Sequence, residues 1–143
     1  MAKFVLTDSC FWLGLVDPTD QHHQSALEWA DFVDTEGAVL VLQWPCLYES
    51  ISTRLVRSRG RTLEFEKILK RPTIHLLDDL TYRDAALEAV FESSRRVGHS
   101  YVLADSVIRE MLKDINLRID YLLTFNALDF ADVCQARRIE LVG

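Results

Sequence analysis

The chain has 143 residues, of which 49% are hydrophobic and 27% are charged, as is typical of a globular domain and not of a disordered chain. Its net charge of −6 argues against a protein that coats nucleic acid through bulk positive charge, although a cluster of metal-binding carboxylates would itself be acidic. The three cysteines, Cys10, Cys46 and Cys134, are too widely spaced for a disulfide framework or a zinc motif, so we expect buried thiols. No apolar run approaches the roughly 20 residues of a membrane span and no secretory leader is evident, so we expect a cytoplasmic protein without membrane contact.

Strand patterns and helix patterns alternate along the chain. In order, the sequence predicts a strand at 4–8, helices at 9–16 and 20–34, a strand at 38–43, helices at 45–60 and 62–70, a strand at 73–77, helices at 81–97 and 101–113, a strand at 119–124, a helix at 126–136 and a strand at 139–142. Residues 38–43 are almost continuously apolar, as in strands that helices cover on both faces. We therefore predict an α/β fold, a single domain over residues 1–143 with a central, mostly parallel β-sheet flanked by helices.

Several acidic residues fall where such a fold forms its site. In open parallel sheets ligands bind beyond the carboxyl ends of the strands, where Asp8, Asn126 and Asp129 are expected. Each also has a simpler interpretation, because Asp8 suits a helix N-cap and Asn126 with Asp129 resembles a capping box. Asp105 lies on the apolar stripe of its helix, where an unpaired carboxylate is costly, so it needs a partner such as Arg109 or a metal ion.

Glu49 lies on a semi-polar helix face, and a salt bridge to a neighbouring arginine is the alternative to a role in the site. Converging acids repel one another unless cations neutralise them, and a ligand set made only of oxygen suits Mg²⁺ or Mn²⁺ better than Zn²⁺. We therefore predict that Asp8, Glu49, Asp105 and Asp129 form a divalent-metal site. Such a site activates a water molecule and stabilises the leaving oxygen of a phosphodiester.

The order of these motifs resembles a known family. The matching segments are Thr7-Asp8-Ser9, Asp17-Pro18-Thr19-Asp20, His23-Gln24-Ser25-Ala26, Tyr48-Glu49, Leu103-Ala104-Asp105-Ser106, Leu123-Thr124-Phe125-Asn126 and Asp129-Phe130. They resemble the PIN domain family and, within it, the VapC-like toxin ribonucleases. The resemblance implies a Mg²⁺/Mn²⁺-dependent endoribonuclease that hydrolyses RNA as the toxin of a type II toxin–antitoxin pair, forms a homodimer and binds a VapB-like antitoxin.

The resemblance also assigns roles to individual residues. The metal ligands would be Asp8, Glu49 and Asp105. Asn126 stands where some members of the family carry an acid, so either Asp129 completes the site or the site has three acids. The residues that would support the site are Ser9, Thr124 and Asn126, with the Thr124 hydroxyl placing a water molecule or a phosphate.

A basic strip surrounds the turn at Gly60. It consists of Arg54, Arg57, Arg59 and Arg61. The strip is either a solvated helix end or a rim that contacts RNA phosphates, which give affinity without reading sequence. By the resemblance, the same region would also help to hold an antitoxin.

Two other functions stay open at this stage. The first is a non-catalytic module with the same fold that binds RNA or a protein. The second is an aspartyl phosphotransfer enzyme with Asp8 as its nucleophile, which would normally carry a second acid at the position that Cys10 occupies.

Overall fold

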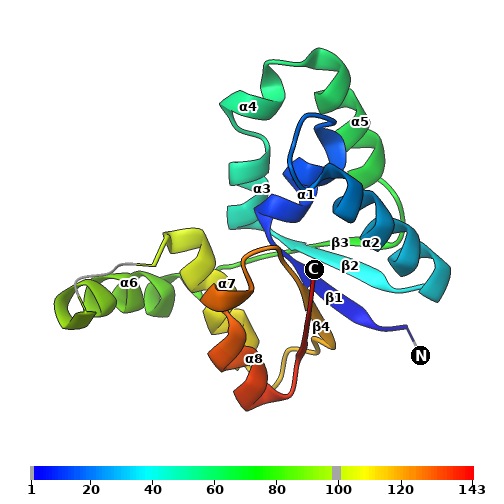
Figure 1. Cartoon of the computed structure of the whole chain (residues 1–143). Coiled ribbons are helices and arrows are strands. Elements are labelled where there is room, and N and C mark those ends of the chain that lie inside the picture. The colour runs from blue at the N-terminus through cyan, green and yellow to red at the C-terminus, as the bar shows by residue number, and fades with distance from the viewer. Residues whose placement is uncertain (1, 98–100) are drawn as a thin grey trace.

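The structure is a computed structural model that describes residues 2–97 and 101–143 (Figure 1). Its elements in chain order are β1 (Phe4–Thr7), α1 (Ser9–Val16), α2 (His23–Glu36), β2 (Val39–Gln43), α3 (Trp44–Ser50), α4 (Thr53–Val56), α5 (Arg59–Leu69), β3 (Ile74–Leu77), α6 (Arg83–Val97), α7 (Leu103–Lys113), β4 (Tyr121–Leu123), the 3-10 turn η1 (Ala127–Asp129), α8 (Ala131–Arg137) and β5 (Glu140–Val142). Among the described residues, no helix is long and apolar enough to span a membrane.

The five strands form one sheet in the order β3-β2-β1-β4-β5, and every neighbouring pair is parallel. The predicted α/β fold with a mostly parallel sheet is therefore confirmed. Because β1 is the central strand, the residue that follows it, Asp8, lies in the middle of the carboxyl edge of the sheet. That edge is where parallel α/β sheets place their ligand sites.

Helices cover both faces of the sheet. Figure 1 shows α1, α2 and α5 on one side of it and α7 and α8 on the other. On the first side the fully buried Trp12 stacks on Phe65, with ring centroids 5.8 Å apart, and its indole N–H donates a 2.7 Å hydrogen bond to the Thr7 hydroxyl. This contact fixes α1 to β1 and thereby sets the start of α1, where Asp8 lies.

Two predicted helices are broken in the structure. The helix expected at 45–60 stops at Ser50, whose hydroxyl donates to the Cys46 carbonyl oxygen at 2.7 Å, and the extended backbone of Ser52 separates α3 from α4. The helix expected at 126–136 is divided into η1 and α8 at Phe130, a buried residue with a non-helical backbone. Burial of Phe130 in the core outweighs helix propensity here. The sequence also offers Gly98 as the residue that ends the helix expected at 81–97, and Gly98 lies outside the described residues.

The helix expected from residue 20 begins later, at His23, because side chains in the preceding loop bind its backbone. Asp17 accepts a 2.9 Å hydrogen bond from the backbone N–H of Thr19, and Asp20 accepts one of 2.8 Å from that of His22. Such local bonds offer the chain an alternative to the helix. His22 takes the N-cap position without a side-chain cap bond, so neither Thr19 nor Asp20, which the sequence offers as caps of this helix, caps it.

Candidate functional site

Asp8 is bound on both carboxylate oxygens. It is the N-cap of α1, and its Oδ1 accepts a 3.1 Å hydrogen bond from the backbone N–H of Cys10. Its Oδ2 accepts a 2.5 Å hydrogen bond from the Thr124 hydroxyl. The side chain is buried, and burial raises its pKa although these hydrogen bonds act in the opposite direction. The capping interpretation of Asp8 is therefore confirmed, and the same carboxylate lies at the edge where the site was expected.

Glu49 approaches this edge from the end of α3. Its Oε1 accepts a 3.1 Å hydrogen bond from the hydroxyl of Ser9, the residue next to Asp8, so the two acids are held by adjacent residues. Burial raises the pKa of the half-buried Glu49, and the nearby charge of Asp8 adds to the effect. Within residues 2–97 and 101–143, Glu49 has no ion pair with an arginine. The salt-bridge alternative for Glu49 is therefore not what the structure shows.

Asp105 lies in the first turn of α7, where the charges of the other three acids of the candidate site affect its pKa. Burial is the main cause that raises its pKa to about 6, and the charges of Asp8, Glu49 and Asp129 act in the same direction. Each of these three acids comes from a different element. Repulsion between charges weakens with distance. Its effect on the pKa of Asp105 therefore indicates that the four carboxylates predicted from the sequence lie near one another.

The arginine considered as a partner for Asp105 is bound elsewhere. Arg109 forms a two-pronged pair with the Asp132 carboxylate, at 2.8 and 2.9 Å, and donates to the carbonyl oxygen of Asp129 at 2.8 Å. This pair joins α7 to α8 and lowers the pKa of Asp132 to about 2. In the described part of the chain Asp105 has no ion-pair partner, so neutralisation by Arg109, the first of the two alternatives, is wrong.

Thr124 joins the end of β4 to the acids. Its buried hydroxyl donates to Asp8 and accepts a 3.0 Å hydrogen bond from the backbone N–H of Asn126. Asn126 precedes η1 without a side-chain cap bond, so the expected capping box with Asp129 does not form. Both Asn126 and Asp129 are exposed, whereas Asp8 and Thr124 are buried. Thr124 therefore positions Asp8, and its contact with water or phosphate stays a prediction.

Cys10 belongs to this neighbourhood, although the sequence indicated only a buried thiol. Its Sγ contacts Asp8 Oδ1 as a hydrogen-bond donor and accepts a 3.3 Å hydrogen bond from the backbone N–H of Phe125. Burial, reinforced by the charge of Asp8, raises the pKa of Cys10 to about 12, so the thiol stays protonated and can keep donating. The signal for this role is its position two residues after a helix N-cap, where the chain turns back toward the capping carboxylate.

Two of the four arginines of the basic strip are engaged within the protein. Arg54 donates to Asp17 and to Asp20, both at 2.7 Å, and Arg61 lies 3.1 Å from Asp17. Hydrogen bonds from Thr19, together with these guanidinium groups, hold the pKa of Asp17 well below its usual range. The two arginines therefore tie the loop between α1 and α2 to α4 and α5.

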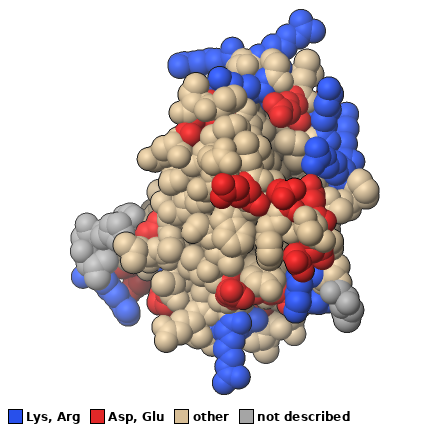
Figure 2. All heavy atoms as spheres, turned by 45° about the vertical axis from the view of Figure 1, so that its right-hand side comes forward, with Lys and Arg blue, Asp and Glu red and all other residues tan. Residues whose placement is uncertain are grey.

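The other two arginines, Arg57 and Arg59, have exposed side chains. Figure 2 shows Lys and Arg side chains gathered at the top of the molecule, where α4 and α5 lie in Figure 1, and acidic side chains across its middle. A basic surface thus borders an acidic one. Phosphate contact by the basic strip stays a prediction, with Arg57 and Arg59 the two members that are free of the Asp17 network.

A cleft of about 750 Å³ between α3, α6 and α7 opens beside Glu49. Its lining includes Pro45, Tyr48, Glu49, Leu87, Val102 and Leu103. Tyr48, which lines the cleft, is 73% exposed. The cleft gives a bound molecule direct access to one edge of the acid neighbourhood.

The fit of this neighbourhood to a metal ion can be judged from its donors. Among residues 2–97 and 101–143, no group of three or more His, Cys, Asp or Glu side chains is arranged to hold a metal ion. The donors are carboxylate oxygens, which suit Mg²⁺ or Mn²⁺. Burial is the main cause that raises the pKa values of Asp8, Glu49 and Asp105. Among the described residues none of the three is paired with a lysine or arginine, so a divalent cation would provide their neutralising charge. The chemistry of the donor set therefore fits such an ion.

Comparison with known proteins identifies the fold. No protein-family model and no curated protein sequence matches the chain. The crystal structure of the Mycobacterium tuberculosis toxin VapC20, described as cleaving the sarcin-ricin loop, matches with a TM-score of 0.65 and 18% identity over 90% of this chain and 94% of its own. The structure of VapBC2 from Rickettsia felis, bound to a DNA fragment from their promoter, matches with a TM-score of 0.64 and 11% identity over 96% of each chain.

The chain therefore has the α/β fold of these two structures. More particularly, its fold is that of the VapC-like PIN proteins, as the motifs of the sequence predicted. At such low identities the likeness establishes the fold alone.

Proposed function

We propose that this protein is a Mg²⁺/Mn²⁺-dependent endoribonuclease. The observation that carries the proposal is the gathering of acids at the carboxyl edge of the sheet, where the Ser9 hydroxyl holds Glu49 next to Asp8. Burial, with the charges of Asp8, Glu49 and Asp129 acting in the same direction, raises the pKa of Asp105 there to about 6. Acids that disfavour one another's ionised form are a poor arrangement for stability and a suitable one for binding a cation. The fold of VapC20, described as cleaving an RNA loop, supports RNA as the substrate.

Asp8, Glu49 and Asp105 would hold the metal ion, with Asp129 as a further carboxylate. A bound divalent ion supplies an activated water molecule and stabilises the leaving oxygen of the phosphodiester. The exposed position of Asp129 suits a group that meets the ion together with the substrate.

Other residues of the chain would keep these carboxylates in place. The Thr124 hydroxyl and the Cys10 thiol both donate to Asp8, and the Ser9 hydroxyl donates to Glu49. These bonds fix the orientation of two ligands before an ion or a substrate arrives. Preorganised ligands lower the free energy needed to assemble a site.

We also propose that the protein acts as the toxin of a type II toxin–antitoxin pair in the cytoplasm, bound by a VapB-like antitoxin. The fold of VapBC2 supports an antitoxin partner. A homodimer is supported by apolar side chains at the surface of α6, α7 and nearby loops. These exposed residues are Leu80, Leu87, Phe91, Val102 and Leu103.

The test is cleavage of a mixed pool of structured RNA by the antitoxin-free protein, with Mg²⁺ or Mn²⁺ and with EDTA. We expect metal-dependent cleavage that Asp105→Asn abolishes. The control variant is Asp31→Asn, which removes the same charge from an exposed site on α2 and should leave cleavage unchanged. A folded protein that neither cuts RNA nor binds a divalent metal would refute the proposal and favour the non-catalytic binding module.

A further inference from the structure

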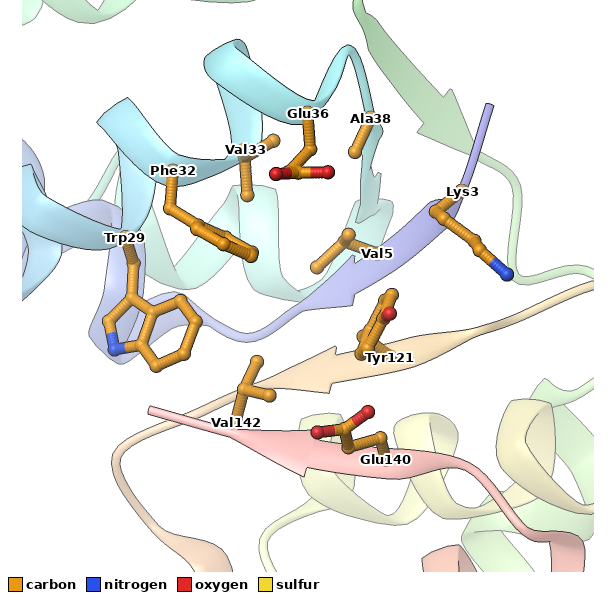
Figure 3. A pocket seen from close by; sticks show the side chains of 10 residues that line it. All are labelled: Lys3, Val5, Trp29, Phe32, Val33, Glu36, Ala38, Tyr121, Glu140 and Val142. Atoms are coloured by element: carbon orange, nitrogen blue, oxygen red, sulfur yellow. The ribbon is translucent and has the colours of Figure 1, made fainter. Parts of the chain in front are cut away.

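A second hollow, of about 220 Å³, lies between α2 and the strands β1, β4 and β5 (Figure 3). None of the four acids of the candidate site lines it. Apolar side chains from α2 face apolar side chains from the sheet across this space. They are Trp29, Phe32 and Val33 on the helix and Val5, Tyr121 and Val142 on the strands. We call this space the α2 hollow.

The α2 hollow leaves apolar surface uncovered. The Trp29 and Phe32 rings meet edge to face, with centroids 5.7 Å apart, and Phe32 is 51% exposed. Together with Tyr121 they place three aromatic rings around the hollow, which we call its aromatic walls. Burial of such rings against a partner is among the stronger contributions to binding.

The rim of the hollow is negatively charged. Glu36, the last residue of α2, and Glu140 of β5 both line it, and neither has an ion pair among the described residues. Lys3 is the one cation of the lining, and Figure 3 shows its amine directed away from the hollow. The carboxyl end of a helix also carries partial negative charge, and Glu36 lies at that end of α2. A bound group is therefore expected to carry positive charge.

The position of β5 indicates that this group belongs to a peptide. β5 is an edge strand, so within the described chain its outer backbone N–H and C=O groups face no neighbouring strand. An extended segment beside it would gain main-chain hydrogen bonds while a side chain entered the hollow.

We propose that the α2 hollow binds an extended peptide segment of a partner protein, in which an apolar side chain is flanked by lysine or arginine. Aromatic walls take the apolar side chain, and Glu36 and Glu140 take the cations. The proposal does not depend on RNA cleavage, since the hollow shares no residue with the acid site.

The test is NMR of the full chain with labelled valine methyl groups, during titration with a synthetic peptide that contains Arg-Phe-Arg between Gly-Ser flanks. We expect saturable shifts of the Val5, Val33 and Val142 methyl signals. A peptide with Glu-Phe-Glu should bind far more weakly, and one with Arg-Ser-Arg should lose the contact with the aromatic walls. The double variant Glu36→Gln/Glu140→Gln should weaken binding by about fivefold, as expected for two partly exposed ion pairs.

The matched control is Glu28→Gln/Asp31→Asn, which removes the same charge from exposed positions on α2 outside the hollow and should retain affinity. Equal binding of the Arg-Phe-Arg and Glu-Phe-Glu peptides would overturn the proposal. So would shifts confined to other methyl groups, or no saturable shift at all. If only phenethylammonium, added as a small-molecule probe, shifted these signals, the site would belong to a small organic cation and the peptide proposal would fail.

Discussion

Asp105→Asn is expected to stabilise the metal-free protein while removing the proposed RNA cleavage. In the folded chain the pKa of Asp105 is raised from its ordinary value of 3.8 to about 6, first by burial and then by the acids Asp8, Glu49 and Asp129. Asparagine has a similar shape and no charge. The substitution therefore removes a charge that the folded state disfavours.

The magnitude follows from linkage. The difference between pKa values of 3.8 and about 6 corresponds to roughly 3 kcal/mol of unfolding free energy at most. Asp105 retains contact with solvent, and screening reduces this figure to about 1.5 kcal/mol. A carboxylate in the first turn of a helix contributes roughly 0.5 kcal/mol in the opposite sense. The net gain for the Asn variant at pH 8 is about 1 kcal/mol.

The sign depends on pH. At pH 4 the folded carboxyl group is protonated and the unfolded one, with its ordinary pKa of 3.8, is about half ionised, so the variant and the wild type should differ by no more than about 0.5 kcal/mol. Between the two pKa values the unfolded chain loses its proton first, so the wild type loses stability as pH rises. Above about pH 6.5 the full difference remains.

The assay is urea unfolding in EDTA at pH 4 and pH 8, with Asp31→Asn as the control for loss of one exposed charge. If Asp105→Asn were no more stable than the wild type at pH 8, or gained equally at pH 4, the inferred repulsion among the four acids would be wrong.

Three other substitutions test the scaffold. Arg54→Ala breaks the hydrogen bonds to the buried Asp17, so it should lower the unfolding free energy by about 1 to 2 kcal/mol. Urea unfolding at pH 7 measures this, and an unchanged midpoint would show that the Arg54–Asp17 pair is not stabilising. Thr124→Val leaves Oδ2 of the buried Asp8 without a hydrogen-bond donor, while Oδ1 keeps its bonds from Cys10. The substitution should therefore cost about 1 to 3 kcal/mol at pH 8 and reduce RNA cleavage, and full activity would contradict the positioning role. Gly37→Ala places a side chain at φ 65° in the C-cap of α2 and should lower thermal stability by about 1 kcal/mol, whereas a rise in Tm would refute this reasoning.

Periodicity and apolar runs predicted the order of the strands and the helices, because each element is consistent with its own local sequence. The breaks in the chain were not predictable in this way. The division of the last helix at Phe130 depends on burial against distant residues, and the late start of α2 depends on hydrogen bonds from Asp17 and Asp20. Tertiary contacts and side-chain bonds outweighed propensity at these places.

Places at strand ends and on inward helix faces picked out the four acids of the candidate site, whose role as metal ligands stays a prediction. The residues that hold them were harder to predict. Thr124 is 116 residues from Asp8 in the chain and Cys10 is 2 residues from it. Only the fold shows that both side chains donate hydrogen bonds to the Asp8 carboxylate. Arg109 illustrates the opposite case. Its spacing from Asp105 suggested an ion pair, whereas in the structure Arg109 pairs with Asp132.

The most direct test of the account is a Mn²⁺ titration of the purified, antitoxin-free protein, with free Mn²⁺ followed by electron paramagnetic resonance. We predict one or two bound ions per chain that Mg²⁺ displaces, and binding at least about tenfold weaker in Asp105→Asn than in Asp31→Asn. Failure of the folded wild type to bind Mn²⁺, or equal binding by Asp105→Asn, would contradict the claim that these acids form a metal site.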